Sequence, residues 1–184
     1  MNGDEVQALL REAIRRLIRQ EWDLAVVGAN ERTITGHLGR FLTEALIGGT
    51  LSVDNDYNRH LLDPKRAWLD NPTMSNETLI EPDIVIHRRG LDEENLLALE
   101  AKKARRCTPH DELKIKALVA KPFLYNFGVL LGFGLTTHKD DSYWRPAWQW
   151  FTEFERYPDY VDVFDEGLCQ ELNVEGRDMW HQRL

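Results

Sequence analysis

Two short acidic segments hold the residues of this chain that are best suited to catalysis. Asp83 ends the first segment, and Glu100 opens the second, where Lys102 follows it two residues later. Paired carboxylates are ligands that Mg²⁺ prefers, and a nearby lysine stabilises charge that develops on a phosphate. These residue types together indicate metal-dependent hydrolysis of a phosphodiester.

The residues next to both segments predict the strands that position them. Apolar runs occupy 84–86, directly after Asp83, and 96–99, directly before Glu100. We expect strands over 79–87 and 95–102, joined by a turn over 88–94, which makes an antiparallel hairpin. Side chains alternate between the faces of a strand, so Glu100 and Lys102 share one face. The hairpin then brings Asp83 beside them.

This arrangement predicts a metal site with a defined set of ligands. Asp83 and Glu100 would bind Mg²⁺ or Mn²⁺, and the carbonyl oxygen of Ala101 would add a third ligand. A bound metal lowers the pKa of a water molecule and holds the scissile phosphate. Lys102 would orient that water or stabilise the charge on the phosphate.

The rest of the chain predicts a mixed sheet flanked by helices, in the α/β class. Apolar residues recur with helical spacing over 4–20 and again over 31–47, where Asn30 is a suitable N-cap. A short strand is expected at 50–53, a long polar loop at 54–77, a helix at 109–120 and a buried strand at 128–135. Beyond these, we expect a short helix at 146–154, and a strand-like start to the segment 161–172.

Length and composition fit one globular domain. The chain has 184 residues, of which 42% are hydrophobic, enough for a packed core. We divide it into an N-terminal helix (1–27), a catalytic core (28–135) and a C-terminal extension packed on the core (136–184). The two cysteines, Cys107 and Cys169, are too isolated for a disulfide framework and are expected to be reduced thiols.

The charge and hydropathy of the chain limit which molecules we expect it to bind. The net charge of −8 argues against a protein that coats DNA, although metal-binding carboxylates contribute to that total. No apolar run approaches the 18 residues of a membrane span, and the acidic N-terminus lacks a secretory signal, so we expect no membrane partner and a cytoplasmic protein. Contacts to nucleic acid are expected from polar and basic residues near the two acidic segments: Asn58, Arg88, Lys103, Arg105 and Arg106.

Pro82-Asp83 followed by Glu100-Ala101-Lys102 resembles the signature of the PD-(D/E)xK nuclease superfamily, which includes many restriction endonucleases and DNA-repair nucleases. The resemblance implies a restriction-endonuclease-like core: helix, three-stranded meander, helix, strand. Stretches at 54–59, 81–90 and 95–103 are also similar to a group of little-characterised bacterial and phage proteins assigned to this superfamily.

The superfamily often places a metal-facing glutamate on its first core helix, and Glu31 is the best match in position. The resemblance therefore implies that Glu31 completes the catalytic and metal-binding set. A simpler role is also open, because negative charge in the first turn favours a helix by itself.

Three functional interpretations follow. The first is a Mg²⁺- or Mn²⁺-dependent endonuclease that acts on DNA, with RNA left open as a substrate and a homodimer left open as its assembly. The second is a catalytically silent module of the same fold that binds nucleic acid or protein. The third is a defence or phage effector nuclease that a partner or ligand activates.

Overall fold

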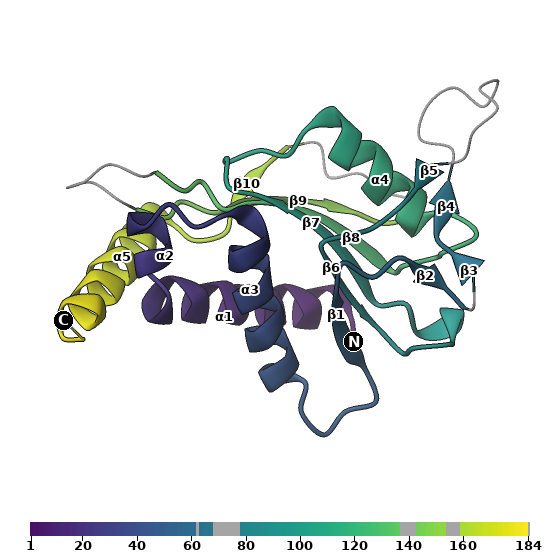
Figure 1. The fold of residues 1–184 in the computed structure, drawn as a ribbon, viewed down its shortest axis with the longest axis horizontal. Helices are drawn as coiled ribbons and strands as arrows, with labels where there is room; N and C mark the ends of the chain where they lie inside the picture. The colour runs from purple at the N-terminus through teal and green to yellow at the C-terminus, as the bar shows by residue number, and fades with distance from the viewer. Residues whose placement is uncertain (62, 68–77, 137–142, 154–158, 184) are drawn as a thin grey trace.

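The computed structural model describes residues 1–61, 63–67, 78–136, 143–153 and 159–183, and it contains a six-stranded mixed sheet with helices on both faces (Figure 1). This confirms the predicted mixed α/β class. Within the described ranges, no helix is both long and apolar enough to cross a membrane. The strands follow the order β1 (Ser52–Asn55), β6 (Ile84–His87), β7 (Leu97–Lys102), β8 (Phe127–Gly132), β9 (Ala147–Phe151) and β10 (Val161–Asp162).

The predicted hairpin is present at the centre of the sheet. β6 and β7 are antiparallel, with Ile84 opposite Leu99 and Ile86 opposite Leu97. β8 lies parallel to β7, and the helix α4 (Pro109–Val119) makes the crossover that a parallel pair requires. β1, β9 and β10 extend the sheet by antiparallel pairing.

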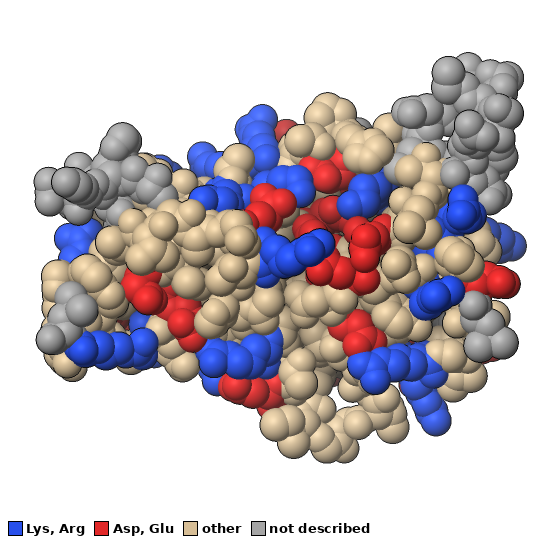
Figure 2. All heavy atoms as spheres, viewed as in Figure 1, with Lys and Arg blue, Asp and Glu red and all other residues tan. Residues whose placement is uncertain are grey.

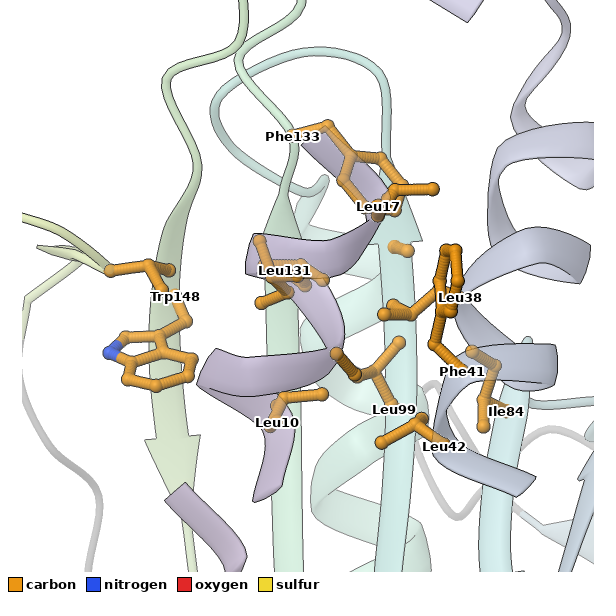
Figure 3. Close-up of a cluster of buried hydrophobic side chains, with 14 of the residues drawn as sticks. Leu10, Leu17, Leu38, Phe41, Leu42, Ile84, Leu99, Leu131, Phe133 and Trp148 are labelled. Carbon is orange, nitrogen blue, oxygen red and sulfur yellow. The ribbon is translucent and has the colours of Figure 1, made fainter. Parts of the chain in front are cut away.

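One face of the sheet is covered by α1 (Gly3–Gln20) and α3 (Glu31–Ala45), as Figure 3 shows for part of the core. Both helices are amphipathic, and their apolar stripes pack against β6, β7 and β8. Asn30 caps α3 as predicted, because its side chain accepts a hydrogen bond of 2.8 Å from the Thr33 amide. The short α2 (Asp23–Val26) follows α1, and α5 (Glu166–His181) packs against α1.

The opposite face of the sheet is covered by α4. Strand alternation sends Leu97 and Leu99 into the core beneath α1 and α3, whereas Ala98 packs with Ile115 and Leu118 of α4. Glu100 has the same parity as Ala98, so its side chain lies on the α4 face.

One predicted element has the wrong type. The segment expected as a helix at 146–154 contains β9 instead, and Phe154 lies outside the described residues. Trp148 and Trp150 pack in the core beneath α1, whereas Phe151 packs in the core beneath α4. Because both faces of this strand are buried, the polar–apolar alternation that reveals a half-exposed strand is missing.

The segment predicted as one long loop also holds short strands. β2 (Arg59–His60) pairs with β3 (Asp63–Pro64), and β4 (Arg66–Ala67) pairs with β5 (Thr78–Leu79), whereas 62 and 68–77 lie outside the described residues. The first strand begins two residues later than predicted. The C-terminal region that follows β10 forms a long helix, α5, which the sequence pattern did not define.

Gly132 lets the loop after β7 cross closely over the end of β8. A Cβ atom at this position would lie 2.0 Å from the carbonyl oxygen of Arg105. We expect Gly132→Ala to lower the free energy of unfolding by about 1–3 kcal/mol, because backbone must move to relieve the overlap.

The matched control for this change is Gly36→Ala, on an exposed position of α3 where the added Cβ would meet no described atom within 4 Å beyond its adjacent residues and the backbone of its own helix turn. It should raise the free energy of unfolding by about 0.5–1 kcal/mol through helix propensity. Urea unfolding of both variants measures the difference. Equal effects of the two changes would contradict the close approach at Gly132.

Candidate functional site

Asp83 lies directly before β6, against the last residues of β7. Its Oδ2 atom accepts a hydrogen bond of 2.7 Å from the amide of Ala101. That amide belongs to the peptide that follows Glu100, so the hairpin brings the Asp83 carboxylate beside the Glu100 residue. Burial raises the pKa of Asp83, and the Ala101 hydrogen bond and the positive charges of Lys102 and Lys114 oppose the increase.

Glu100 is a fully buried carboxylate, with 0% of its side chain exposed. Lys114 Nζ lies 2.5 Å from Oε1, an ion pair by distance although its angles do not satisfy hydrogen-bond geometry. Oε2 accepts no hydrogen bond from any residue that the structure describes. Burial, followed by the negative charge of Asp83, raises the pKa of Glu100 to about 8.

Lys102 lies between two carboxylates. Its Nζ donates a hydrogen bond of 2.9 Å to Oε1 of Glu31 and lies 3.7 Å from Oδ1 of Asp111. Partial burial alone would lower the pKa of Lys102, but the hydrogen bond to Glu31 and the neighbouring negative charges outweigh it and raise the pKa. Lys102 is therefore held in its cationic form.

Glu31 stands at the start of α3 and ties that helix to the end of β7. Besides Lys102, it accepts a hydrogen bond of 3.1 Å from the Lys103 amide through Oε2. Glu31 was predicted as a metal ligand, and that role stays a prediction; in this structure Oε1 accepts from the Lys102 ammonium group and Oε2 from the Lys103 amide. The amide N–H of Ala101 donates to Asp83, and the predicted metal contact of the Ala101 carbonyl oxygen stays a prediction.

The carboxylate oxygens of Asp83 and Glu100 are ligands that suit a hard cation such as Mg²⁺, which keeps several bound waters. Among the described residues, no group of three or more His, Cys, Asp or Glu residues is arranged to hold a metal ion. Two carboxylates remain, Asp83 and Glu100, and the second has a buried oxygen without a hydrogen-bond partner. A buried carboxylate oxygen left unpaired is costly, and a bound Mg²⁺ ion would satisfy it. The residues therefore fit Mg²⁺ or Mn²⁺ with two protein carboxylates.

Three of the predicted nucleic-acid contacts lie in the loop after β7, beside Lys102. Lys103 Nζ donates to the carbonyl oxygen of Gly28, and Arg105 pairs with Asp162. The Arg106 guanidinium is exposed and lies 5.7 Å from the centre of the Tyr160 ring. Figure 2 shows acidic side chains gathered near the centre of one face, with Lys and Arg side chains around them.

The other two predicted contacts differ in their placement. Asn58 follows the end of β1 that lies next to Asp83. The amide of Asp56, two residues before Asn58, donates a hydrogen bond to the carbonyl oxygen of Asp83. Arg88 follows the opposite end of β6 and forms an ion pair with Glu94. The structure therefore does not bring Arg88 to the group formed by Asp83, Glu100 and Lys102.

Sequence reasoning missed two residues of the site, Asp111 and Lys114, both on α4. Asp111 forms a capping box with Thr108 and also faces Lys102. Lys114 shares a helix face with Leu118, four residues further on, which packs on the sheet. One feature of the sequence could have revealed Lys114. It is a lysine next to the apolar stripe of the helix that directly follows the strand of Glu100.

Cys107 is a partly buried thiol near the site. Its Sγ lies 3.7 Å from the carbonyl oxygen of Glu100, and burial raises the pKa of the thiol to about 12. Cys107 and Cys169 are both free, as expected from the sequence. A thiol with so high a pKa carries almost no thiolate at neutral pH.

No protein-family model matches the chain, and comparisons with curated proteins and with solved structures find no significant match. The likeness to PD-(D/E)xK nucleases therefore rests on the sequence motif and stays a prediction.

Proposed function

We propose that this protein is a metal-dependent phosphodiester hydrolase that acts on DNA, built on a restriction-endonuclease-like core. The observation that carries the proposal is Glu100, a fully buried carboxylate with an unpaired oxygen, adjacent to Asp83 and on the strand that bears Lys102. A site of this kind combines oxygen ligands with a fixed positive charge. Such a combination suits phosphoryl chemistry.

The residues divide into two roles. Asp83 and Glu100 would hold the cation, which when bound supplies an activated water and neutralises charge on the phosphate. Lys102 remains cationic, because Glu31 and Asp111 flank its ammonium group, and it therefore stabilises the charge of the transition state rather than acting as a base. Glu31 is a positioning residue in this scheme.

A nucleic-acid substrate is supported by the basic residues beside the site. The loop 103–106 carries three cationic side chains at the end of β7. Arg32, on the first turn of α3, is 80% exposed and pairs loosely with Asp56 at 3.3 Å. Cations on two sides of an acidic centre provide contacts for a phosphate backbone that passes over it.

Metal removal tests this proposal. The purified protein should cleave at least one member of a panel of single-stranded, duplex and branched DNA in Mg²⁺ or Mn²⁺, and EDTA should abolish cleavage. Returning the metal should restore it, because the carboxylates need a divalent cation to polarise water. Gel analysis of end-labelled substrates measures the products, with RNA as the comparison substrate. Cleavage that persists in EDTA would contradict the proposal, and cleavage of RNA alone would contradict the choice of DNA.

A further inference from the structure

Lys114 has no part in the mechanism above, yet it forms an ion pair with a fully buried carboxylate. Only 16% of its side chain is exposed, and its partner Glu100 is fully buried. Moving two charges out of water costs free energy that their attraction only partly returns. This pair is therefore a poor source of stability, and its geometry indicates another role.

The ion pair distinguishes the two oxygens of Glu100. Neither oxygen accepts a hydrogen bond of regular geometry from the described residues, but Lys114 Nζ lies 2.5 Å from Oε1, so the ammonium charge is placed at Oε1. We infer that Lys114 is a positioning residue: it holds Oε1 so that Oε2 is presented to the divalent metal, and it keeps this contact when the metal binds. The inference rests on the proposed function, because it assigns a role at the same metal site.

The charge balance of the cluster agrees with a lysine that stays in place. Four carboxylates and two ammonium groups leave two negative charges when every group is ionised. One divalent cation neutralises that charge, so the metal does not need to displace an ammonium group. The carboxylates are Glu31, Asp83, Glu100 and Asp111, and the ammonium groups are Lys102 and Lys114.

The helix that carries Lys114 is fixed at both the start and the middle. The capping box of Thr108 and Asp111 anchors its first turn. Further along, Gly128 of β8 allows α4 to approach the sheet, since a Cβ there would lie 2.5 Å from Cγ2 of Ile115. A lysine on so firmly packed a helix is already in position before any metal arrives.

Mn²⁺ affinity, measured from the electron paramagnetic resonance signal of free Mn²⁺, tests this role without depending on cleavage. Lys114→Met should weaken Mn²⁺ binding by about 10–100-fold, because the residue that orients a ligand is lost. Lys114→Arg, which keeps the charge, should recover most of the affinity. Lys116→Met on the same helix is the matched control and should bind like wild type, because Lys116 is exposed and pairs with Glu112.

Equal or tighter Mn²⁺ binding by Lys114→Met would overturn the inference, because the ammonium group would then be idle or a competitor of the metal. Should that variant not fold, labelling of wild-type lysines with an amine reagent, read by mass spectrometry, gives the answer. Lys114 labelling should not rise when Mn²⁺ is added, and an increase would show that the metal displaces it.

The two proposals fail in different ways. If wild type binds Mn²⁺ and Lys114→Met binds it weakly, but no nucleic acid is cleaved, the nuclease proposal fails and the role of Lys114 stands. If wild type cleaves DNA while Lys114→Met keeps full Mn²⁺ affinity, only the role of Lys114 fails. If wild type binds no Mn²⁺, both fail.

Discussion

Replacing Lys102 with methionine is expected to reduce the cleavage rate about 10²–10³-fold while leaving Mn²⁺ affinity close to that of wild type. Lys102 contacts Glu31 and Asp111, and neither of these is assigned as a metal ligand. Methionine keeps most of the volume of lysine but removes the charge that, in the proposed function, stabilises the phosphate. The loss should therefore appear in kcat and not in metal binding. Single-turnover cleavage and Mn²⁺ titration of the same preparation measure the two quantities.

Lys116→Met is the control for this change, since it removes an exposed lysine from the nearby helix. It should cleave at the wild-type rate. If Lys102→Met lost Mn²⁺ binding as severely as cleavage, Lys102 would be supporting the metal site, and its assigned role at the phosphate would be wrong. Cleavage by Lys102→Met at the wild-type rate would also contradict this role of Lys102.

Glu100→Gln is expected to raise the free energy of unfolding of the metal-free protein. It should also abolish the further stabilisation that Mg²⁺ gives to wild type. At pH 7 an unfolded Glu100, with the ordinary pKa of 4.5, is ionised, whereas the folded protein raises that pKa to about 8 and so keeps a proton. Because each pKa unit corresponds to about 1.4 kcal/mol, the glutamate costs the folded state roughly 3 kcal/mol at pH 7. Glutamine never ionises in either state, so it avoids most of this cost, and we expect a gain of about 2 kcal/mol once the burial of its amide group is allowed for.

The stability of the metal-free protein should depend on pH because of Glu100. A carboxyl whose folded pKa is raised favours the folded state at low pH, and stability falls as pH rises from 4.5 toward 8. Metal-free wild type should show this decline in urea unfolding, and Glu100→Gln should flatten it. Mg²⁺ should stabilise wild type but not the variant, because the ligand oxygen has lost its charge. Glu94→Gln, which changes a surface ion pair with Arg88, is the control and should behave like wild type.

A destabilised Glu100→Gln protein at pH 7 would show that Glu100 is a structural residue. Its ion pair with Lys114 would then contribute more than its burial costs. That outcome would remove the main physical argument for a metal at this position, since an unpaired buried oxygen would no longer need a cation.

Local patterns were sufficient for the parts of the site that depend on one hairpin. Two apolar runs separated by a turn predicted the pairing of β6 and β7, and period-two alternation placed Glu100 and Lys102 on one face. The Asn30 cap and the first turn of α3 were also evident from local sequence, because capping depends on adjacent residues.

The missed features depend on how distant elements pack. Lys114 meets Glu100 only because α4 crosses the sheet in one particular orientation, and nothing in residues 109–119 alone encodes that partner. The contact of Glu31 with Lys102 likewise depends on where α3 docks. In β9, burial of both faces, including Gln149, concealed the strand period and favoured a helical interpretation.

The most direct test of the nuclease proposal is Mg²⁺-dependent cleavage by wild type and Asp83→Asn, purified side by side and assayed on the same DNA. Asparagine keeps the shape of Asp83 and an oxygen that can accept the hydrogen bond from Ala101, but it removes the charge needed to bind the metal. Wild type should cut and Asp83→Asn should lose activity by at least about 10³-fold. Equal cleavage by the two proteins, or no cleavage by wild type with any metal, would contradict the account.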